Sequence, residues 1–142
     1  MQRIVVGVDG SDSARRALDW ALSQAASEDV VVLAHTWSIP AVSGFEVPVS
    51  SLVGLEAAAK RTVANLAASV ETEDGPTIET DVQSGHAGLR LAALSAEADL
   101  LVVGSRGYGG FKGMLLGSVS TYVVHHAECP VTVVRSQDAG QD

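Results

Sequence analysis

The chain has 142 residues, of which 46% are hydrophobic, and it carries a formal net charge of −8. This length suits a single domain with its own core, and the hydrophobic content excludes an intrinsically disordered chain. The negative charge argues against nucleic acid as the main partner, because an acidic chain repels a phosphate backbone.

The sequence shows no signal for secretion or membrane insertion. No basic segment followed by a long apolar stretch opens it, and no apolar run approaches the roughly 20 residues of a membrane span. A single cysteine, Cys129, excludes a disulfide within the chain. We expect a cytoplasmic protein that does not act at a membrane, with one domain over residues 1–136 and a flexible tail over residues 137–142.

Apolar runs and helical spacing predict strands and helices that alternate along the chain. In chain order, the expected elements are a strand at Arg3–Asp9, a helix capped by Ser11 or Asp12, a strand at Asp29–Trp37, a helix at Leu52–Val70, a strand at Thr77–Gln83, a helix at Ala87–Ala98, a strand at Asp99–Gly104, a helix from Ser118 to about Ala127 and a strand at Val131–Arg135. This alternation predicts an α/β fold, a doubly wound five-stranded parallel sheet with helices on both faces.

Two connecting segments are candidates for function. Ser38–Ser51 contains Pro40 and Pro48, and a loop of this length in a compact domain is usually functional or mobile. We expect it to be a mobile flap near a ligand. Gly104–Ser118 is rich in glycine, and it joins the carboxyl end of a buried strand to the start of a helix.

The glycine-rich segment is suited to binding phosphate. Glycines let the backbone approach a phosphate closely, and the free amides at a helix start attract an anion. A Walker A loop is excluded, because Lys112 is followed by Gly113 and Met114. A dinucleotide fingerprint that starts at Gly107 would need glycine in place of Lys112, and it should follow the first strand.

One spacing in this segment resembles the nucleotide-binding signature of the universal stress protein family: Gly104-x2-Gly107-x9-Gly117-Ser118. The resemblance extends over nearly the whole chain. Ile4–Ser11 is similar to the family's first strand and acidic turn, Ala98–Gly107 to its fourth strand and loop, and Cys129–Arg135 to its closing strand. It implies the ATP-binding class of that family and a strand order of 3-2-1-4-5.

The resemblance also assigns a ligand site. The residues that it places around the nucleotide are Asp9, Gly10, Ser11, Thr36, Val103, Gly104, Arg106, Gly107, Gly117, Ser118, Val119 and Ser120. Within this set, Thr36 is expected beside the adenine and Asp9 on the ribose and phosphate side. Arg106 and Lys112 are the cations of the glycine-rich segment, and each either contacts phosphate or is solvated. We expect ATP to bind with Mg²⁺ or Mn²⁺.

A physical argument supports the same strand order. Ligands of doubly wound sheets bind at the carboxyl ends of the strands, where the strand order reverses. In the order 3-2-1-4-5 the reversal lies between the first and fourth strands, which end at Asp9 and Gly104. In the flavodoxin-like order 2-1-3-4-5 the two loops would be apart.

Several other residues have simpler interpretations. His125 and His126 point about 100° apart on a helix and cannot easily share a metal ion. His35 is expected to pack in the core, and His86 either caps the following helix or lies at the rim of the pocket. Cys129 is interpreted as a small apolar filler and not as a nucleophile.

Three functions remain open. The leading one is an ATP-binding stress-response or regulatory protein that acts as a nucleotide-dependent binding module. The second is a slow ATPase or phosphoryl-transfer enzyme, for which only Asp9 and either Arg106 or Lys112 can be nominated. The third is a structural dimer module without nucleotide. We also expect a homodimer through Val131–Arg135, an edge strand without an internal charge or proline.

Overall fold

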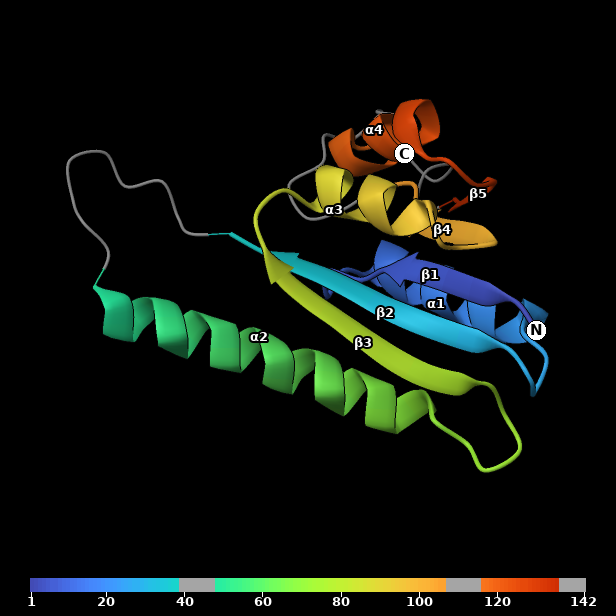
Figure 1. Cartoon of the computed structure of the whole chain (residues 1–142), viewed down its shortest axis with the longest axis horizontal. Helices are drawn as coiled ribbons and strands as arrows, with labels where there is room; N and C mark the ends of the chain where they lie inside the picture. The colour runs from blue at the N-terminus through green and yellow to red at the C-terminus, as the bar shows by residue number, and fades with distance from the viewer. Residues whose placement is uncertain (39–47, 107–115, 136–142) are drawn as a thin grey trace.

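Five parallel strands form one sheet in the order β3-β2-β1-β4-β5, which confirms the predicted fold (Figure 1). The computed structural model describes residues 1–38, 48–106 and 116–135. In chain order its elements are β1 Arg3–Gly7, α1 Asp12–Gln24, β2 Val30–Trp37, α2 Val49–Val70, β3 Thr77–Ser84, α3 Ala87–Ser95, β4 Leu100–Gly104, α4 Ser118–His126 and β5 Val131–Val134.

The core lies in two layers, one on each face of the sheet. On one face, α1 and α2 pack side chains such as Leu18 and Val63 against Ile4 and Val6 of β1. On the other face, α3 and α4 do the same, and their buried side chains meet Val5, Val32, Leu101 and Val103. The strands are aliphatic on both faces because each face is covered, as expected for a parallel sheet between helices.

Two helix boundaries differ from those predicted. Helix α2 begins at Val49, inside the segment that was expected to be a loop, and α3 ends at Ser95 and not at Ala98. Pro48 is the N-cap residue of α2, and proline suits a helix start because it has no amide hydrogen to leave unpaired. The predicted flap falls largely on residues 39–47, which lie outside the described residues, as does the tail.

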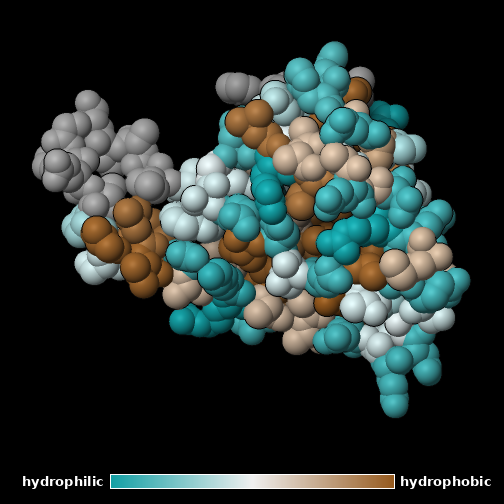
Figure 2. Space-filling view, viewed as in Figure 1, coloured by the Kyte–Doolittle hydropathy of each residue, from teal (hydrophilic) through white to brown (hydrophobic). Residues whose placement is uncertain are grey.

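Helix α2 extends past the sheet. Of its 22 residues only Val63 is buried, and Leu55 is 38% exposed. Figure 1 shows the start of α2 reaching beyond the carboxyl ends of the strands. Figure 2 shows apolar side chains on the surface at the same end of the molecule, and the exposed residues there include Val49 and Val53. None of the helices in the described ranges is long and apolar enough to cross a bilayer.

Two carboxylates fix the start of the central strand. Asp29 accepts hydrogen bonds from the amides of Gln2, at 2.7 Å, and Ala26, at 2.8 Å. These bonds hold the pKa of Asp29 below its usual value, because both favour the charged carboxylate. Asp99 accepts from the amide of Arg3 at 2.7 Å. The amino ends of β1, β2 and β4 are therefore tied together, and their carboxyl ends emerge side by side at the opposite edge.

Candidate functional site

The turn after β1 is closed by its own side chains. Oδ1 of Asp9 accepts hydrogen bonds from the amide of Ser11, at 2.9 Å, and from its hydroxyl, at 2.5 Å. Gly10 has a φ of 84°, a conformation that favours glycine. The Ser11 hydroxyl in turn accepts from the amide of Ala14 at 3.1 Å and so caps α1. Asp9 thus places a negative charge at the start of α1, where the helix dipole favours it.

The end of β4 is pressed against the first turn of α1. A Cβ added to Gly104 would lie 2.7 Å from both the carbonyl carbon and the carbonyl oxygen of Ser13, closer than real contacts allow. The hydroxyl of Ser13 accepts a hydrogen bond from the amide of Arg106 at 3.2 Å, and Ser13 itself is buried. Nε of Arg106 is buried and has no hydrogen-bond partner among the described residues. The strand–loop junction is therefore built around glycine and leaves one guanidinium N–H unpaired.

Helix α4 is held to the same junction by its own first turn. The amide of Gly117 donates to the carbonyl of Ser105 at 2.6 Å. The buried hydroxyl of Ser120 is 3.1 Å from that carbonyl and 3.0 Å from the carbonyl of Gly117. The Ser120 side chain therefore positions the helix start, while the Ser118 side chain is exposed.

The amides that begin α4 have no side-chain cap. Its N-cap residue is Gly117, which has no side chain to accept their hydrogen bonds, and no acidic residue lies in the first turn. Free amides at a helix start carry partial positive charge and attract anions. Together with Arg106, they make this corner of an acidic molecule favourable for an anionic group.

The remaining predicted site residues are placed as follows. Thr36 is half-buried near the end of β2, and the amide of Val8 donates to the carbonyl of Ala34 at 2.9 Å, which sets Thr36 beside the Asp9 turn. Val103 is 3% exposed and packs in the core, so only its backbone is near the junction. Gly107 and Lys112 lie outside the described residues.

His35 has a role that the sequence did not predict. Its Nδ1 lies 2.8 Å from the carbonyl oxygen of Val8. Because a carbonyl only accepts, Nδ1 carries the hydrogen and donates it. The half-buried imidazole thus ties β2 to the residue just before Asp9, and the sequence offered no signal for a partner so far along the chain.

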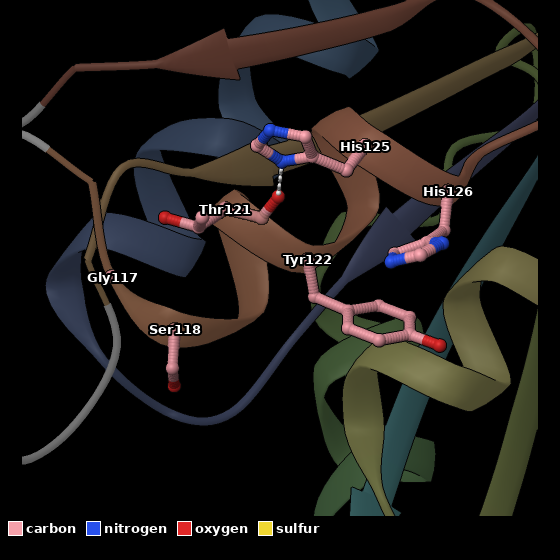
Figure 3. A pocket seen from close by; sticks show the side chains of 6 residues that line it. All are labelled: Gly117, Ser118, Thr121, Tyr122, His125 and His126. Carbon is pink, nitrogen blue, oxygen red and sulfur yellow. Dashed lines mark hydrogen bonds between the residues drawn. The ribbon is translucent and has the colours of Figure 1, made fainter.

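An open groove of about 430 Å³ runs along the outer side of α4 (Figure 3). Its lining residues are Gly117, Ser118, Thr121, Tyr122, His125 and His126. The ring of Tyr122 lies 4.2 Å from that of His126 and 5.7 Å from that of His86, centroid to centroid. Nδ1 of His86 accepts from the amide of Leu89 at 3.3 Å and caps α3, which was one of its two predicted roles.

Two further predictions concern metal and thiol chemistry. Within the described ranges, no three histidine, cysteine, aspartate or glutamate side chains are grouped so that they could hold a metal ion. Nδ1 of His125 donates to the carbonyl of Thr121 at 2.8 Å, a contact within its own helix. The pKa of Cys129 is raised, first by burial and then by the charge of Asp99. Its thiol is therefore unsuited to act as a nucleophile, in line with the predicted filler role.

Comparisons with known proteins identify the family of this chain. The family model described as the universal stress protein family matches residues 1–135. Universal stress protein Rv2005c of Mycobacterium tuberculosis is 37% identical over 139 residues, which cover 93% of this chain and 45% of that protein. The chain thus spans about half the length of this relative.

Solved structures share the fold over almost the whole chain. Universal stress protein UspA from Lactobacillus plantarum superposes with a TM-score of 0.77 at 26% identity, covering 94% of this chain and 97% of that one. A universal stress protein in complex with cAMP gives a TM-score of 0.62 at 32% identity, with 94% and 96% covered. The chain therefore belongs to the universal stress protein family.

Proposed function

We propose that the protein is a nucleotide-dependent regulatory module that binds ATP, with Mg²⁺ or Mn²⁺, at the carboxyl edge between β1 and β4. The observation that carries the proposal is the corner where Arg106, with its unpaired buried Nε, meets the uncapped start of α4. Within the described ranges, Nε of Arg106 has no acceptor and no side chain caps α4, and phosphate oxygens can supply the missing acceptors. Support for an adenine nucleotide comes from the family relative solved with cAMP.

The charges at the starts of α1 and α4 favour one orientation of the nucleotide in the proposed site. The negative charge of Asp9 at the start of α1 repels phosphates, whereas the start of α4 attracts them. The phosphates therefore lie at α4, contacted by the amides of Ser118 and Val119 and by the exposed Ser118 hydroxyl. Asp9 has one oxygen, Oδ2, that Ser11 does not use. It faces a ribose hydroxyl or the metal ion, and Thr36 lies on the adenine side.

We propose binding and not turnover as the main activity. Efficient phosphoryl transfer needs a positioned metal, a group that orients the attacking nucleophile and cationic stabilisation of the transferred charge. In the described part of this corner, Asp9 uses its Oδ1 to hold the Ser11 turn, and the other nearby acid, Asp12, lies in the first turn of α1. A slow ATPase in the same pocket remains the alternative, and a single-turnover assay of bound ATP distinguishes the two.

Thermal unfolding of nucleotide-free protein tests the proposal. MgATP at 100 times its dissociation constant should stabilise the fold by about 2.7 kcal/mol. For a chain of this size, that raises Tm by roughly 5–10 °C. GTP serves as the base control, and acid denaturation of protein purified without added nucleotide shows whether ATP, ADP or nothing is carried. No shift with millimolar MgATP in protein shown to be nucleotide-free would refute the proposal.

We further propose a homodimer through β5. The topology leaves two edge strands, β3 and β5. Strand β3 carries Glu79 and Asp81, charges of the kind that discourage pairing between edges, whereas β5 reads Val-Thr-Val-Val. Val124, 48% exposed, lies about 200° around α4 from Tyr122 and hence on the side away from α3. A two-fold contact pairs two copies of β5 antiparallel and extends the sheet across both subunits.

The register of β5 turns this into a test. The amide of Leu101 donates to the carbonyl of Pro130, and the amide of Ser105 donates to that of Val134. In a parallel ladder with Leu101 opposite Val131, the amides of Thr132 and Val134 then face β4, and those of Val131 and Val133 face outward. Val133→Pro should give a folded monomer, whereas Thr132→Pro should destabilise the fold. Light scattering measures the oligomeric state of the parent and both variants, and a parent that is monomeric at tens of micromolar would refute the dimer.

A further inference from the structure

We propose that Arg106, held in place by the Ser13 hydroxyl, sets the preference of the site for ligands with a doubly charged terminal phosphate, such as ATP and AMP, over cyclic monophosphates. The inference rests on the proposed nucleotide site. It assigns Ser13, which belongs to neither the predicted site nor the glycine signature, as a positioning residue.

Arg106 joins two elements of the site. Its backbone amide is fixed to the Ser13 hydroxyl in the first turn of α1. The preceding residue, Ser105, accepts hydrogen bonds from the amide of Gly117 and the hydroxyl of Ser120 in α4. Residues 105–106 are therefore hydrogen-bonded to both helix starts.

One N–H of the Arg106 side chain has no hydrogen-bond acceptor among the described residues. Burying an N–H without an acceptor costs free energy, and the cost is larger for a charged group. Nε of Arg106 is buried and unpaired among the described residues, although the side chain starts beside an uncapped helix. A guanidinium forms two parallel hydrogen bonds, through Nε and a terminal nitrogen, to the oxygens of a phosphate. A phosphate at the start of α4 would supply the missing acceptor.

The charge of the phosphate makes the interaction selective. A terminal phosphate carries about two negative charges at neutral pH, and its free oxygens accept the two-pronged hydrogen bond. A cyclic phosphodiester carries one charge, so its Coulomb attraction to the same cation is about half as large. Adenosine carries no phosphate and should not sense Arg106 at all.

Ser13 acts through Arg106 and not on the ligand. Its hydroxyl is buried against Gly104 and accepts from the Arg106 amide, so it fixes where the arginine side chain begins. Ser13→Ala removes this bond but leaves the charge in place. We therefore expect a smaller version of the same selectivity change, and no additional loss when Arg106 is already replaced.

Titration calorimetry with ATP, AMP, cAMP and adenosine tests the inference in five proteins: the parent, Arg106→Gln, Arg106→Lys, Ser13→Ala and the double variant Ser13→Ala with Arg106→Gln. Arg106→Gln should weaken the binding of ATP and AMP by at least about tenfold. It should weaken the binding of cAMP less, and it should leave the binding of adenosine unchanged. The ATP affinity of Arg106→Lys should lie between those of the parent and Arg106→Gln, because lysine keeps the charge but not the planar guanidinium group. Ser13→Ala should weaken ATP by about three- to tenfold.

Controls separate this inference from the proposed function. Arg61→Gln removes the same charge from an exposed position on α2 and should leave the ATP affinity unchanged. If the parent binds none of the four ligands, the proposed function fails. If the parent binds ATP but Arg106→Gln weakens the binding of adenosine as much as that of ATP, or weakens the binding of neither, the role assigned to Arg106 is wrong. An additive double variant would overturn the role assigned to Ser13.

Discussion

Two helices begin at the carboxyl edge of the same sheet, and their starts are finished in opposite ways. Helix α1 is closed by its own sequence: the Ser11 hydroxyl caps it, and the Asp9 carboxylate supplies the negative charge that its dipole favours. Helix α4 follows Gly117 and has neither a capping side chain nor an acid in its first turn. A helix start completed by its own side chains serves the fold, whereas under the proposed function the incomplete start of α4 is the one that receives the phosphates.

Making α4 resemble α1 should have the largest effect. Gly117→Asp supplies α4 with a cap and a negative charge, so the stability of the apoprotein should change by only a few tenths of a kcal/mol. A carboxylate about 4 Å from a phosphate costs up to about 4 kcal/mol near a protein surface, which corresponds to a loss of up to about 1,000-fold in ATP affinity. Titration calorimetry measures this loss of ATP affinity.

A matched control accompanies this variant. Gly54→Asp adds the same charge on α2, where a side chain meets nothing within 4 Å, and it should bind ATP like the parent. Parental ATP affinity in Gly117→Asp would show that the phosphates do not lie at α4.

The contact between β4 and α1 should be the next most sensitive feature. Gly104→Ala forces a methyl group into the backbone of Ser13, and such overpacking costs about 1–3 kcal/mol. Gly54→Ala is the matched control, and it should stabilise the protein by up to about 1 kcal/mol, because alanine favours helix and the space is open. Urea unfolding of both variants measures the opposite signs. A Gly104→Ala variant as stable as the parent would contradict the close packing seen here.

A pair of serine variants sharpens the contrast at the two helix starts. Ser11→Ala removes the cap of α1 and should lower stability by about 1 kcal/mol. Ser118→Ala occupies the first turn of α4, where the hydroxyl caps nothing, so stability should be unchanged while ATP binds less tightly. Thermal unfolding with and without MgATP reads both effects. Equal destabilisation by the two variants would mean that α4 is capped after all.

The smallest effect concerns Asp29, at the amino edge. Because its pKa is lowered in the fold, its contribution to stability is present above the unfolded pKa of about 4 and disappears as the pH falls through the folded value. Asp29→Asn should therefore be less stable than the parent at pH 6, and the gap in Tm should narrow toward pH 3. A gap that is constant across this range would show that Asp29 acts by shape alone.

Much of this arrangement was predictable, because it depends on local pattern. Alternating apolar runs predicted the strands. The family resemblance implied the strand order, the expectation that Asp9 and Gly104 end neighbouring strands supported it, and the structure confirms it. Gly117 and Ser118 marked the start of α4 to the residue. The start of α2 was missed because Pro48 was interpreted as a loop residue, although proline suits the beginning of a helix equally well.

The contacts that give the corner its geometry were not predictable from pattern. Gly104 was assigned to the ligand site by resemblance, and nothing in its local sequence signals that the first turn of α1 lies where its side chain would be. Ser13 and Arg106 are 93 residues apart in sequence, and nothing in either local segment signals the bond between them. The exposed Ser118 and the buried Ser120 look alike in sequence, and only their angular positions on α4 separate a free hydroxyl from one used inside the loop.

Two histidines at this edge make hydrogen bonds of opposite sense. Nδ1 of His35 donates to the carbonyl of Val8 and ties β2 to the residue just before Asp9. Nδ1 of His86 accepts from the amide of Leu89 and caps α3, so the ring hydrogen of His86 is on Nε2. The same type of side chain therefore joins two strands as a donor and finishes a helix as an acceptor, and exchanging the two tautomers would break both contacts.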